Sequence, residues 1–129
     1  MITHPNIVEN KEIFETQKDI RIVMEQVKDG SLENHLNNFK MEPEECLRIM
    51  HQLITAIDYM HASGIVHRDI KPDNILIVKN NDDSVLKIKI TDFGLSKIIT
   101  PSQTIDGREF CGSLLYVAPE ICQKLPYGK

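Results

Sequence analysis

Hydrophobic and polar residues alternate in two neighbouring stretches near the start of the chain. Residues 20–25 are rich in β-branched side chains and partly alternate, which predicts a strand because successive side chains of a strand face opposite sides. Residues 8–15 can pair with them, with residues 16–19 as the turn. The chain then breaks at Gly30 and Ser31, and the Ser31 hydroxyl can cap a short helix that runs to about residue 39.

A longer helical pattern occupies residues 43–63. Pro43 suits the first turn of a helix, and the acidic residues Glu44 and Glu45 favour the positive end of the helix dipole. Gly64 then ends the helix. Apolar residues recur at steps of three and four and predict one apolar face, made of Cys46, Ile49, Met50, Leu53, Ile54, Ile57 and Met60.

The second half of the chain contains short β-like runs and irregular segments. Residues 75–78 and 85–90 predict two short strands, separated by a polar turn at residues 79–84. Residues 92–119 have few periodic apolar positions, which predicts a loop-rich stretch. Two strands, two helices, two short strands and one long loop indicate an α+β fold, in one domain or a piece of one, as the length of 129 residues also suggests.

Composition and charge narrow the class of protein. Hydrophobic residues make up 41% and charged residues 26% of the chain, which suits a globular protein with a buried core. The net charge of -4 argues against nucleic acid as a direct partner, and no apolar run is long enough to span a membrane. Cys46, Cys111 and Cys122 form no CxxC pair, so we expect neither disulfides nor a zinc site, and a cytoplasmic or nuclear location.

Charged and polar residues gather in three short motifs after the long helix. These are HRDIKPDN at residues 67–74, DFG at residues 92–94 and APE at residues 118–120. Phosphoryl transfer needs an aspartate to meet the attacking hydroxyl, a lysine to balance the travelling phosphate, and oxygen ligands to hold magnesium. The motifs offer each of these residue types in loops at strand ends, where such groups can converge.

In this order and spacing the three motifs resemble the catalytic loop, the metal-binding loop and the end of the activation segment of protein kinases. The lysine two residues after Asp69 resembles serine/threonine rather than tyrosine kinases. Residues 4–8 and 23–27 resemble the segment after helix C and the hinge of that family, so the resemblance covers essentially the whole chain. The sequences of the later segments most resemble those of the calcium/calmodulin-dependent group of kinases, especially checkpoint kinases of the forkhead-associated type.

The resemblance implies a partial kinase-like fold. It would comprise the end of the small lobe, the hinge and the first half of the helical large lobe. Residues 1–27 would supply the small-lobe strands and the hinge. Residues 28–129 would supply the large-lobe portion with the catalytic loop and the activation segment.

The resemblance also implies catalytic roles for individual residues. Asp69 would be the base that accepts or orients the substrate hydroxyl, and Lys71 would contact the transferred phosphate. Asn74 and Asp92 would bind Mg²⁺. Ser113 would lie near Asp69 and help to form the substrate-docking loop.

The ATP site implied by the resemblance lies around the hinge. Glu25 and Val27 would offer backbone groups to the adenine. Met24 would be the gatekeeper behind the adenine, and Leu76 would form the floor beneath it.

The activation segment departs from the family at one charged position. Glu109 stands two residues before Cys111, where many relatives carry an activating phosphothreonine that pairs with the arginine before the catalytic aspartate, here Arg68. Glu109 is either a solvated surface charge or a partial substitute for that phosphate. Phosphorylation of Thr104, or of Thr100, would then add further control.

A second departure concerns Asn10. The family usually has an apolar residue there, in an internal hydrophobic stack that includes His67 and Phe93. A polar amide at this place is expected to make an active conformation less robust.

The resemblance implies ATP-dependent phosphorylation of serine or threonine in protein substrates by a full-length parent, with ATP and Mg²⁺ as cofactors. The family's glycine-rich loop, strand lysine and helix-C glutamate do not occur in these 129 residues, nor does the central helix or the arginine that pairs with Glu120. We therefore expect the chain alone to be inactive and loosely packed. The alternatives are a pseudokinase-like regulatory or binding fragment without catalysis, and a truncated gene model with no independent product. The sequence favours no particular oligomeric state.

Overall fold

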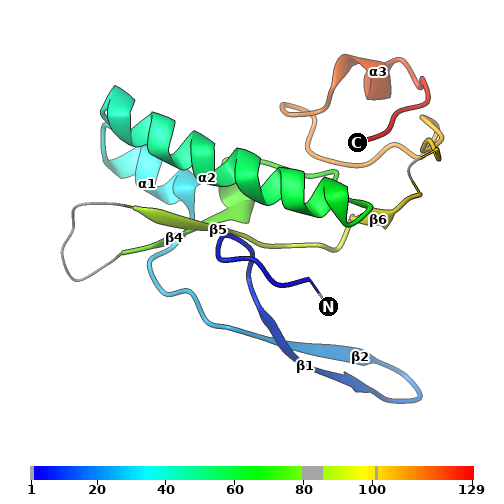
Figure 1. Ribbon diagram of the computed structural model, residues 1–129, viewed down its shortest axis with the longest axis horizontal. Helices are drawn as coiled ribbons and strands as arrows, with labels where there is room; N and C mark the ends of the chain where they lie inside the picture. The colour runs from blue at the N-terminus through cyan, green and yellow to red at the C-terminus, as the bar shows by residue number, and fades with distance from the viewer. Residues whose placement is uncertain (1, 80–85, 101) are drawn as a thin grey trace.

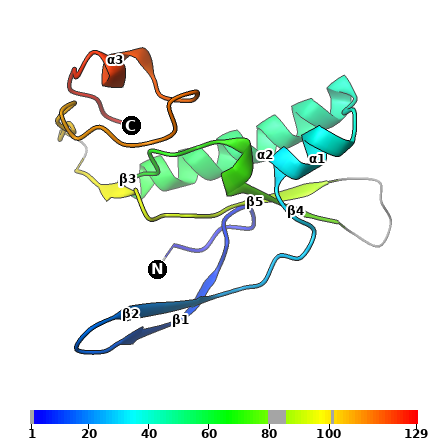
Figure 2. The same cartoon turned by 180° about the vertical axis from the view of Figure 1, so that it is seen from behind.

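The computed structural model describes residues 2–79, 86–100 and 102–129. Its elements are β1 (Asn10–Glu15), β2 (Ile20–Met24), α1 (Leu32–Asn38), α2 (Pro43–Ala62), β3 (Ile65–Val66), the 3-10 helix Pro72–Asn74, β4 (Ile75–Val78), β5 (Lys87–Ile90), β6 (Lys97–Ile98) and α3 (Pro119–Cys122). The α1 and α2 helices lie beside the β4–β5 pair, the β1–β2 hairpin extends away from them, and the C-terminal segment with α3 lies near the end of α2 (Figures 1 and 2). This mixed architecture confirms the predicted α+β class.

The β4–β5 pair supplies one side of the main core. The two strands are antiparallel, with Ile75 opposite Ile90 and Ile77 opposite Ile88, and all four side chains are buried. These four isoleucines share one face because side chains alternate along a strand, and that face packs against α2. The predicted strand at residues 75–78 is confirmed. Most of the predicted turn, and residue 85 of the next strand, lie outside the described residues.

The apolar face of α2 is only partly covered. Ile49, Leu53, Ala56 and Met60 are buried, at spacings of four, three and four residues. Three other members of the predicted face, Cys46, Met50 and Ile54, are exposed. The β4–β5 pair covers one side of the helix, while Leu47, Met50 and Ile54 form an apolar row that no described residue buries.

Both predicted helix boundaries follow from local chemistry. The Ser31 hydroxyl accepts a hydrogen bond from the Asn34 amide and caps α1, as its sequence position indicated. Gly64 follows α2 with a φ of +75°, and a β-carbon there would lie 2.7 Å from the Ile99 carbonyl oxygen. Only glycine fits this turn, which leads the chain directly from α2 into β3.

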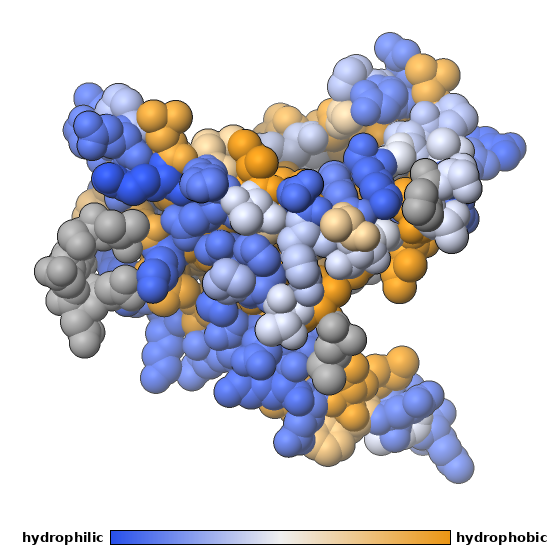
Figure 3. All heavy atoms as spheres, viewed as in Figure 1, coloured by the Kyte–Doolittle hydropathy of each residue, from blue (hydrophilic) through white to orange (hydrophobic). Residues whose placement is uncertain are grey.

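The β1–β2 hairpin confirms the first predicted element pair, with Thr16 and Asp19 closing the turn. The first strand begins at Asn10 rather than at residue 8, because the Val8 amide donates to the Ile90 carbonyl of β5 instead. The hairpin carries exposed apolar side chains, visible as hydrophobic patches in the lower right of Figure 3: Ile13, Phe14, Ile20, Ile22, Val23 and Met24.

A second, smaller core lies towards the C-terminus and consists of Val66, Ile99, Ile105, Ile121 and Tyr127. The β3 and β6 strands pair beside it, so the predicted loop-rich stretch at residues 92–119 contains one short strand that the sequence did not indicate. Two-residue strands are too short to produce a periodic pattern. Glu120 is exposed, so its carboxylate is solvated and does not need the family arginine to avoid a buried charge.

None of the helices in the described part of the chain is long and apolar enough to cross a membrane. Cys46, Cys111 and Cys122 are all unpaired thiols.

Candidate active site

The loop that joins β3 to β4 is anchored by His67, which is buried. Nε2 of His67 lies 3.0 Å from the Thr91 carbonyl oxygen, and Nδ1 lies 3.3 Å from the Asp69 amide nitrogen. A neutral ring that carries its hydrogen on Nε2 satisfies both contacts, since a carbonyl only accepts and an amide only donates. Burial lowers the pKa of His67 despite the opposing effects of Thr91, Asp69 and Asp92, which favours the neutral ring. His67 therefore ties the loop to the segment that follows β5.

Asp69 is the centre of a polar cluster and is itself buried. Its Oδ1 accepts hydrogen bonds from the Ser113 amide (3.0 Å) and hydroxyl (2.9 Å). Its Oδ2 lies 3.2 Å from the Lys71 ammonium and accepts from the Asn74 side-chain amide at 3.0 Å. Burial raises the pKa of Asp69, but the hydrogen bonds from Ser113 and Lys71 outweigh it and hold the pKa below its ordinary value. The carboxylate is therefore kept ionised.

Lys71 and Ser113 complete this arrangement by contacting each other. The Lys71 ammonium donates to the Ser113 hydroxyl oxygen at 2.7 Å, while that hydroxyl donates to Asp69. A serine hydroxyl thus lies between a carboxylate that accepts its hydrogen and a cation beside its oxygen. A hydroxyl that loses its proton while its oxygen gains negative charge needs these two groups.

Asn74 and Asp92 are brought together by the backbone. The Thr91 amide donates to the Asn74 carbonyl at 3.0 Å, which holds the residue preceding Asp92 beside Asn74. The Asn74 side-chain nitrogen is committed to Asp69, which leaves its oxygen as the ligand atom. Asp92 is exposed and has a left-handed backbone with a φ of 61°, a conformation that aspartate tolerates and that recurs at functional sites.

These two oxygen donors fit Mg²⁺. Magnesium prefers hard oxygen ligands and is bound in proteins through one or two side chains, with waters and phosphate oxygens completing its shell. The described residues contain no group of three or more His, Cys, Asp or Glu side chains that could enclose a metal by themselves, a pattern compatible with this open mode of binding.

The segment after β2 contains the residues predicted to contact adenine. The Glu25 amide donates to the Glu9 carbonyl at 2.9 Å. Of the two backbone groups of Glu25 that were predicted to be available to adenine, only the carbonyl is therefore left. Val27 and Leu76 are half-buried, and Met24 is 50% exposed at the end of β2.

The Glu25 side chain is fixed by an ion pair with Lys89, in which both side chains are largely buried. Burial raises the pKa of Glu25, but the bonds from Lys89 and the Glu9 amide outweigh it and lower the pKa. Lys89 lies opposite Leu76 in the β4–β5 pair, so this ion pair fastens the segment after β2 to the strand that leads to Asp92.

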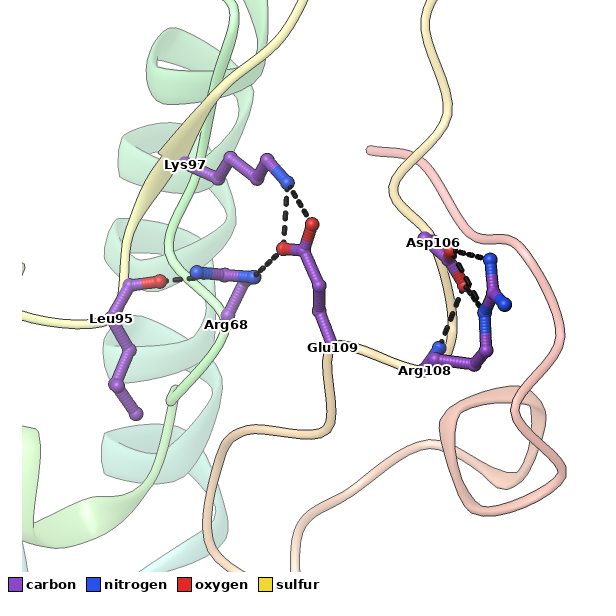
Figure 4. A network of polar contacts seen from close by, with 6 residues as sticks. All are labelled: Arg68, Leu95, Lys97, Asp106, Arg108 and Glu109. Atoms are coloured by element: carbon purple, nitrogen blue, oxygen red, sulfur yellow. Dashed lines mark hydrogen bonds and ion pairs between the residues drawn. The ribbon is translucent and has the colours of Figure 1, made fainter.

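The activation segment contacts this site through Glu109. Its carboxylate lies 3.4 Å from the Arg68 guanidinium and 2.6 Å from the Lys97 ammonium (Figure 4). Thr104 and Thr100 are both exposed, and Pro101 lies outside the described residues.

Sequence reasoning missed Lys89 and Lys97. Neither belongs to a motif, and each meets its partner only after folding, since Lys89 and Glu25 are 64 residues apart. Asn10 lines a cavity of about 330 Å³ whose lining also includes Phe93. The rings of Phe93 and His67 meet edge-on with centroids 4.9 Å apart.

Comparison with known proteins adds the family context. The family described as Protein kinase domain matches residues 1–129. The chain is 43% identical to CBL-interacting serine/threonine-protein kinase 5 of Arabidopsis thaliana, over 98% of this chain and 28% of the relative. It is 38% identical to Sperm motility kinase 2B of Mus musculus, over 98% of the chain and 25% of the relative. It is 40% identical to Serine/threonine-protein kinase DCLK3 of Mus musculus, over 98% of the chain and 16% of the relative. The chain thus spans between 16% and 28% of the length of these relatives.

Proposed function

This chain belongs to the protein kinase family, and from that premise we propose that the full-length protein transfers the terminal phosphoryl group of ATP to serine or threonine in protein substrates. The observation that carries the proposal is the ionised, buried Asp69 in contact with Lys71, Asn74 and a serine hydroxyl. Relatives named as serine/threonine kinases support the choice of acceptor. The more specific calcium/calmodulin-dependent grouping stays a prediction.

Asp69 would orient the substrate hydroxyl and accept its proton. The low pKa of Asp69 suits it to hold the hydroxyl by a hydrogen bond, with proton transfer late in the reaction. Lys71 would balance charge on the oxygens of the moving phosphoryl group. Mg²⁺, when bound, would neutralise the phosphate tail, and the oxygens of Asn74 and Asp92 would hold it.

We further propose that the two parts of the chain divide this work. Residues 1–27 would contribute the small-lobe strands and the hinge, where Glu25, Val27 and Met24 would surround the adenine above Leu76. Residues 28–129 would contribute the catalytic loop and the activation segment. The exposed β1–β2 hairpin, and the ion pair that joins Glu25 in the segment after it to Lys89, support a hinge between two bodies.

The test uses full-length protein with labelled ATP, Mg²⁺ and a serine/threonine peptide library. We expect transfer by the wild type and none by Asp69→Asn, which preserves the size of the side chain but removes its charge. Asp73→Asn is the matched control, because Asp73 is an exposed carboxylate in the same loop, and it should retain activity. A wild-type protein that binds ATP but transfers nothing would favour the pseudokinase-like alternative. Activity unaffected by Asp69→Asn would contradict the role proposed for Asp69.

A further inference from the structure

Ser113 belongs to the activation segment, yet its hydroxyl lies where the hydroxyl of a substrate is proposed to bind. The hydroxyl donates to Asp69 Oδ1 at 2.9 Å, and its oxygen accepts from the Lys71 ammonium at 2.7 Å. Phosphoryl transfer needs these two groups around its acceptor, a carboxylate for the proton and a cation beside the oxygens that gain charge. The chain therefore carries an acceptor-like serine at its own catalytic aspartate.

The backbone around Ser113 holds this hydroxyl in place. The Ser113 amide donates to the same Asp69 oxygen at 3.0 Å, and the Ser113 carbonyl accepts from the Tyr116 amide at 2.8 Å. Gly112 has a φ of +99°, and a β-carbon there would lie 2.7 Å from the Arg68 carbonyl oxygen, so the segment passes close against the catalytic loop. An acceptor held in this way reacts within one molecule and avoids the entropy cost of an encounter between two molecules.

The turn that contains Ser113 is exposed and belongs to neither core. The Ser113 side chain is half-buried, and the two residues that follow it, Leu114 and Leu115, are 78% and 92% exposed. A segment with few buried apolar contacts moves locally at little cost in free energy. The turn can therefore carry the Ser113 oxygen to a phosphorus atom held beside Asp69 while both cores stay packed.

We propose that Ser113 is a self-phosphorylation site: in the full-length protein it accepts the terminal phosphoryl group of a nucleoside triphosphate bound to the same molecule, and the product is inactive. The inference rests on the proposed function. A bond forms between Ser113 Oγ and the terminal phosphorus, the bond from that phosphorus to its bridging oxygen breaks, and the nucleoside diphosphate leaves with the electron pair. The Ser113 proton passes to Asp69, which already accepts it in a hydrogen bond.

The phosphate switches the site off through its charge and through lost contacts. A phosphoserine carries a charge of about −1.5 to −2 at neutral pH, and here it lies beside the Asp69 carboxylate. Repulsion between these like charges raises the pKa of Asp69, and Asp69 Oδ1 loses the hydroxyl hydrogen that it accepts from Ser113. The phosphate also competes for the Lys71 ammonium, which lies 3.2 Å from Asp69 Oδ2. One transfer onto Ser113 therefore silences the molecule.

Two other hydroxyls of the same segment serve as internal controls. Ser96 is half-buried like Ser113, but its hydroxyl donates to the Phe93 carbonyl at 2.7 Å instead of to Asp69. Thr104 is exposed, so a neighbouring molecule can phosphorylate it. A phosphate that comes from another molecule accumulates at a rate that rises with protein concentration, whereas transfer within one molecule does not depend on concentration.

The experiment incubates phosphatase-treated, full-length wild type with ATP and Mg²⁺ but without peptide, and maps the phosphate by mass spectrometry. We expect phosphate on Ser113 at a rate that is independent of protein concentration, and none on Ser96. Asp69→Asn should lack this phosphate, and Ser113→Thr should carry it at the same position. A saturating serine/threonine peptide should slow the modification, because the two hydroxyls compete for Asp69.

A second measurement does not need self-phosphorylation. Phosphoserine incorporated at position 113 during synthesis should lower peptide phosphorylation by at least about tenfold, and phosphatase should restore it. In the same protein without nucleotide, carbon NMR of the Asp69 carboxyl should show a pKa above that of the unmodified protein. Full peptide phosphorylation and an unchanged pKa of Asp69 would overturn the proposed silencing.

The outcomes separate this inference from the proposed function. Peptide phosphorylation without phosphate on Ser113, or phosphate on Ser113 at a rate that rises with protein concentration, would overturn the inference and leave the proposed function intact. Phosphate on Ser113 with no transfer to any peptide would support the inference and refute transfer to other proteins. Absence of phosphate from both the peptide and Ser113 would overturn both.

Discussion

Replacing Ser113 by alanine tests the link between the activation segment and Asp69. The change removes the hydroxyl that donates to Asp69 Oδ1 at 2.9 Å and accepts from Lys71 at 2.7 Å, but keeps the Ser113 amide bond at 3.0 Å. Asp69 then loses one of the hydrogen bonds that stabilise its charged form. Its pKa should therefore rise.

The magnitude follows from the kind of bond that is lost. A hydrogen bond to a charged group contributes about 1.5–3 kcal/mol, and the lower end suits this site because the amide and Asn74 remain as donors. Since a shift of one pKa unit corresponds to about 1.4 kcal/mol, we expect the pKa of Asp69 to rise by about one unit.

The assay is the pH dependence of kcat/KM for the full-length protein, which reports the pKa of the free enzyme's essential groups. Asp69 must be ionised to accept the hydroxyl hydrogen, so a higher pKa moves the acidic limb of the profile to higher pH, by about one unit for Ser113→Ala. Ser113→Thr keeps a hydroxyl and serves as the control, with its acidic limb near that of the wild type. An acidic limb that stays in place or moves to lower pH in Ser113→Ala would refute the reasoning.

Three further predictions concern packing and charge. Gly112→Ala places a β-carbon 2.7 Å from the Arg68 carbonyl, so peptide phosphorylation should fall by at least about tenfold, whereas Gly128→Ala, with no atom within 4 Å, should have no effect. The pKa of Glu25 is lowered on folding, so the stability it confers is complete above the unfolded pKa near 4.5 and is lost as the pH falls through the folded value. In urea titrations, Glu25→Gln should therefore have a lower free energy of unfolding at pH 7 than the wild type. On acidification, the free energy of unfolding should fall less in Glu25→Gln than in the wild type, and an equal fall in the two proteins would contradict this. Residues 1–129 alone have an uncovered apolar row on α2 and exposed apolar side chains on the β1–β2 hairpin. They should therefore bind a hydrophobic dye and transfer no phosphate. A sharp cooperative unfolding transition from an active monomer would show this expectation to be wrong.

Local patterns were sufficient to predict most of the elements. The Ser31 cap, the Pro43 start of α2 and the alternation of Ile75 and Ile77 depend on residues a few positions apart, so they can be recognised before the chain folds. The motifs likewise placed Asp69 and Lys71 in one loop, because those two residues are neighbours in sequence.

Contacts between distant segments could not be predicted in this way. Which part of the apolar face of α2 is buried depends on where the β4–β5 pair packs, so the sequence pattern alone did not show that Met50 and Ile54 would be exposed. The short β3 and β6 strands exist because each has the other as partner, and neither carries a pattern of its own.

By itself, the sequence determined the α+β class, the kinase motifs and the residue types available for chemistry. It also identified Glu109 as a charged residue that is either solvated or paired with Arg68. The tertiary structure decided that Glu109 meets both Arg68 and Lys97. Lys97 approaches Arg68 only because β6 pairs with β3, and the energy of an ion pair depends on the distance between charges in space rather than along the chain.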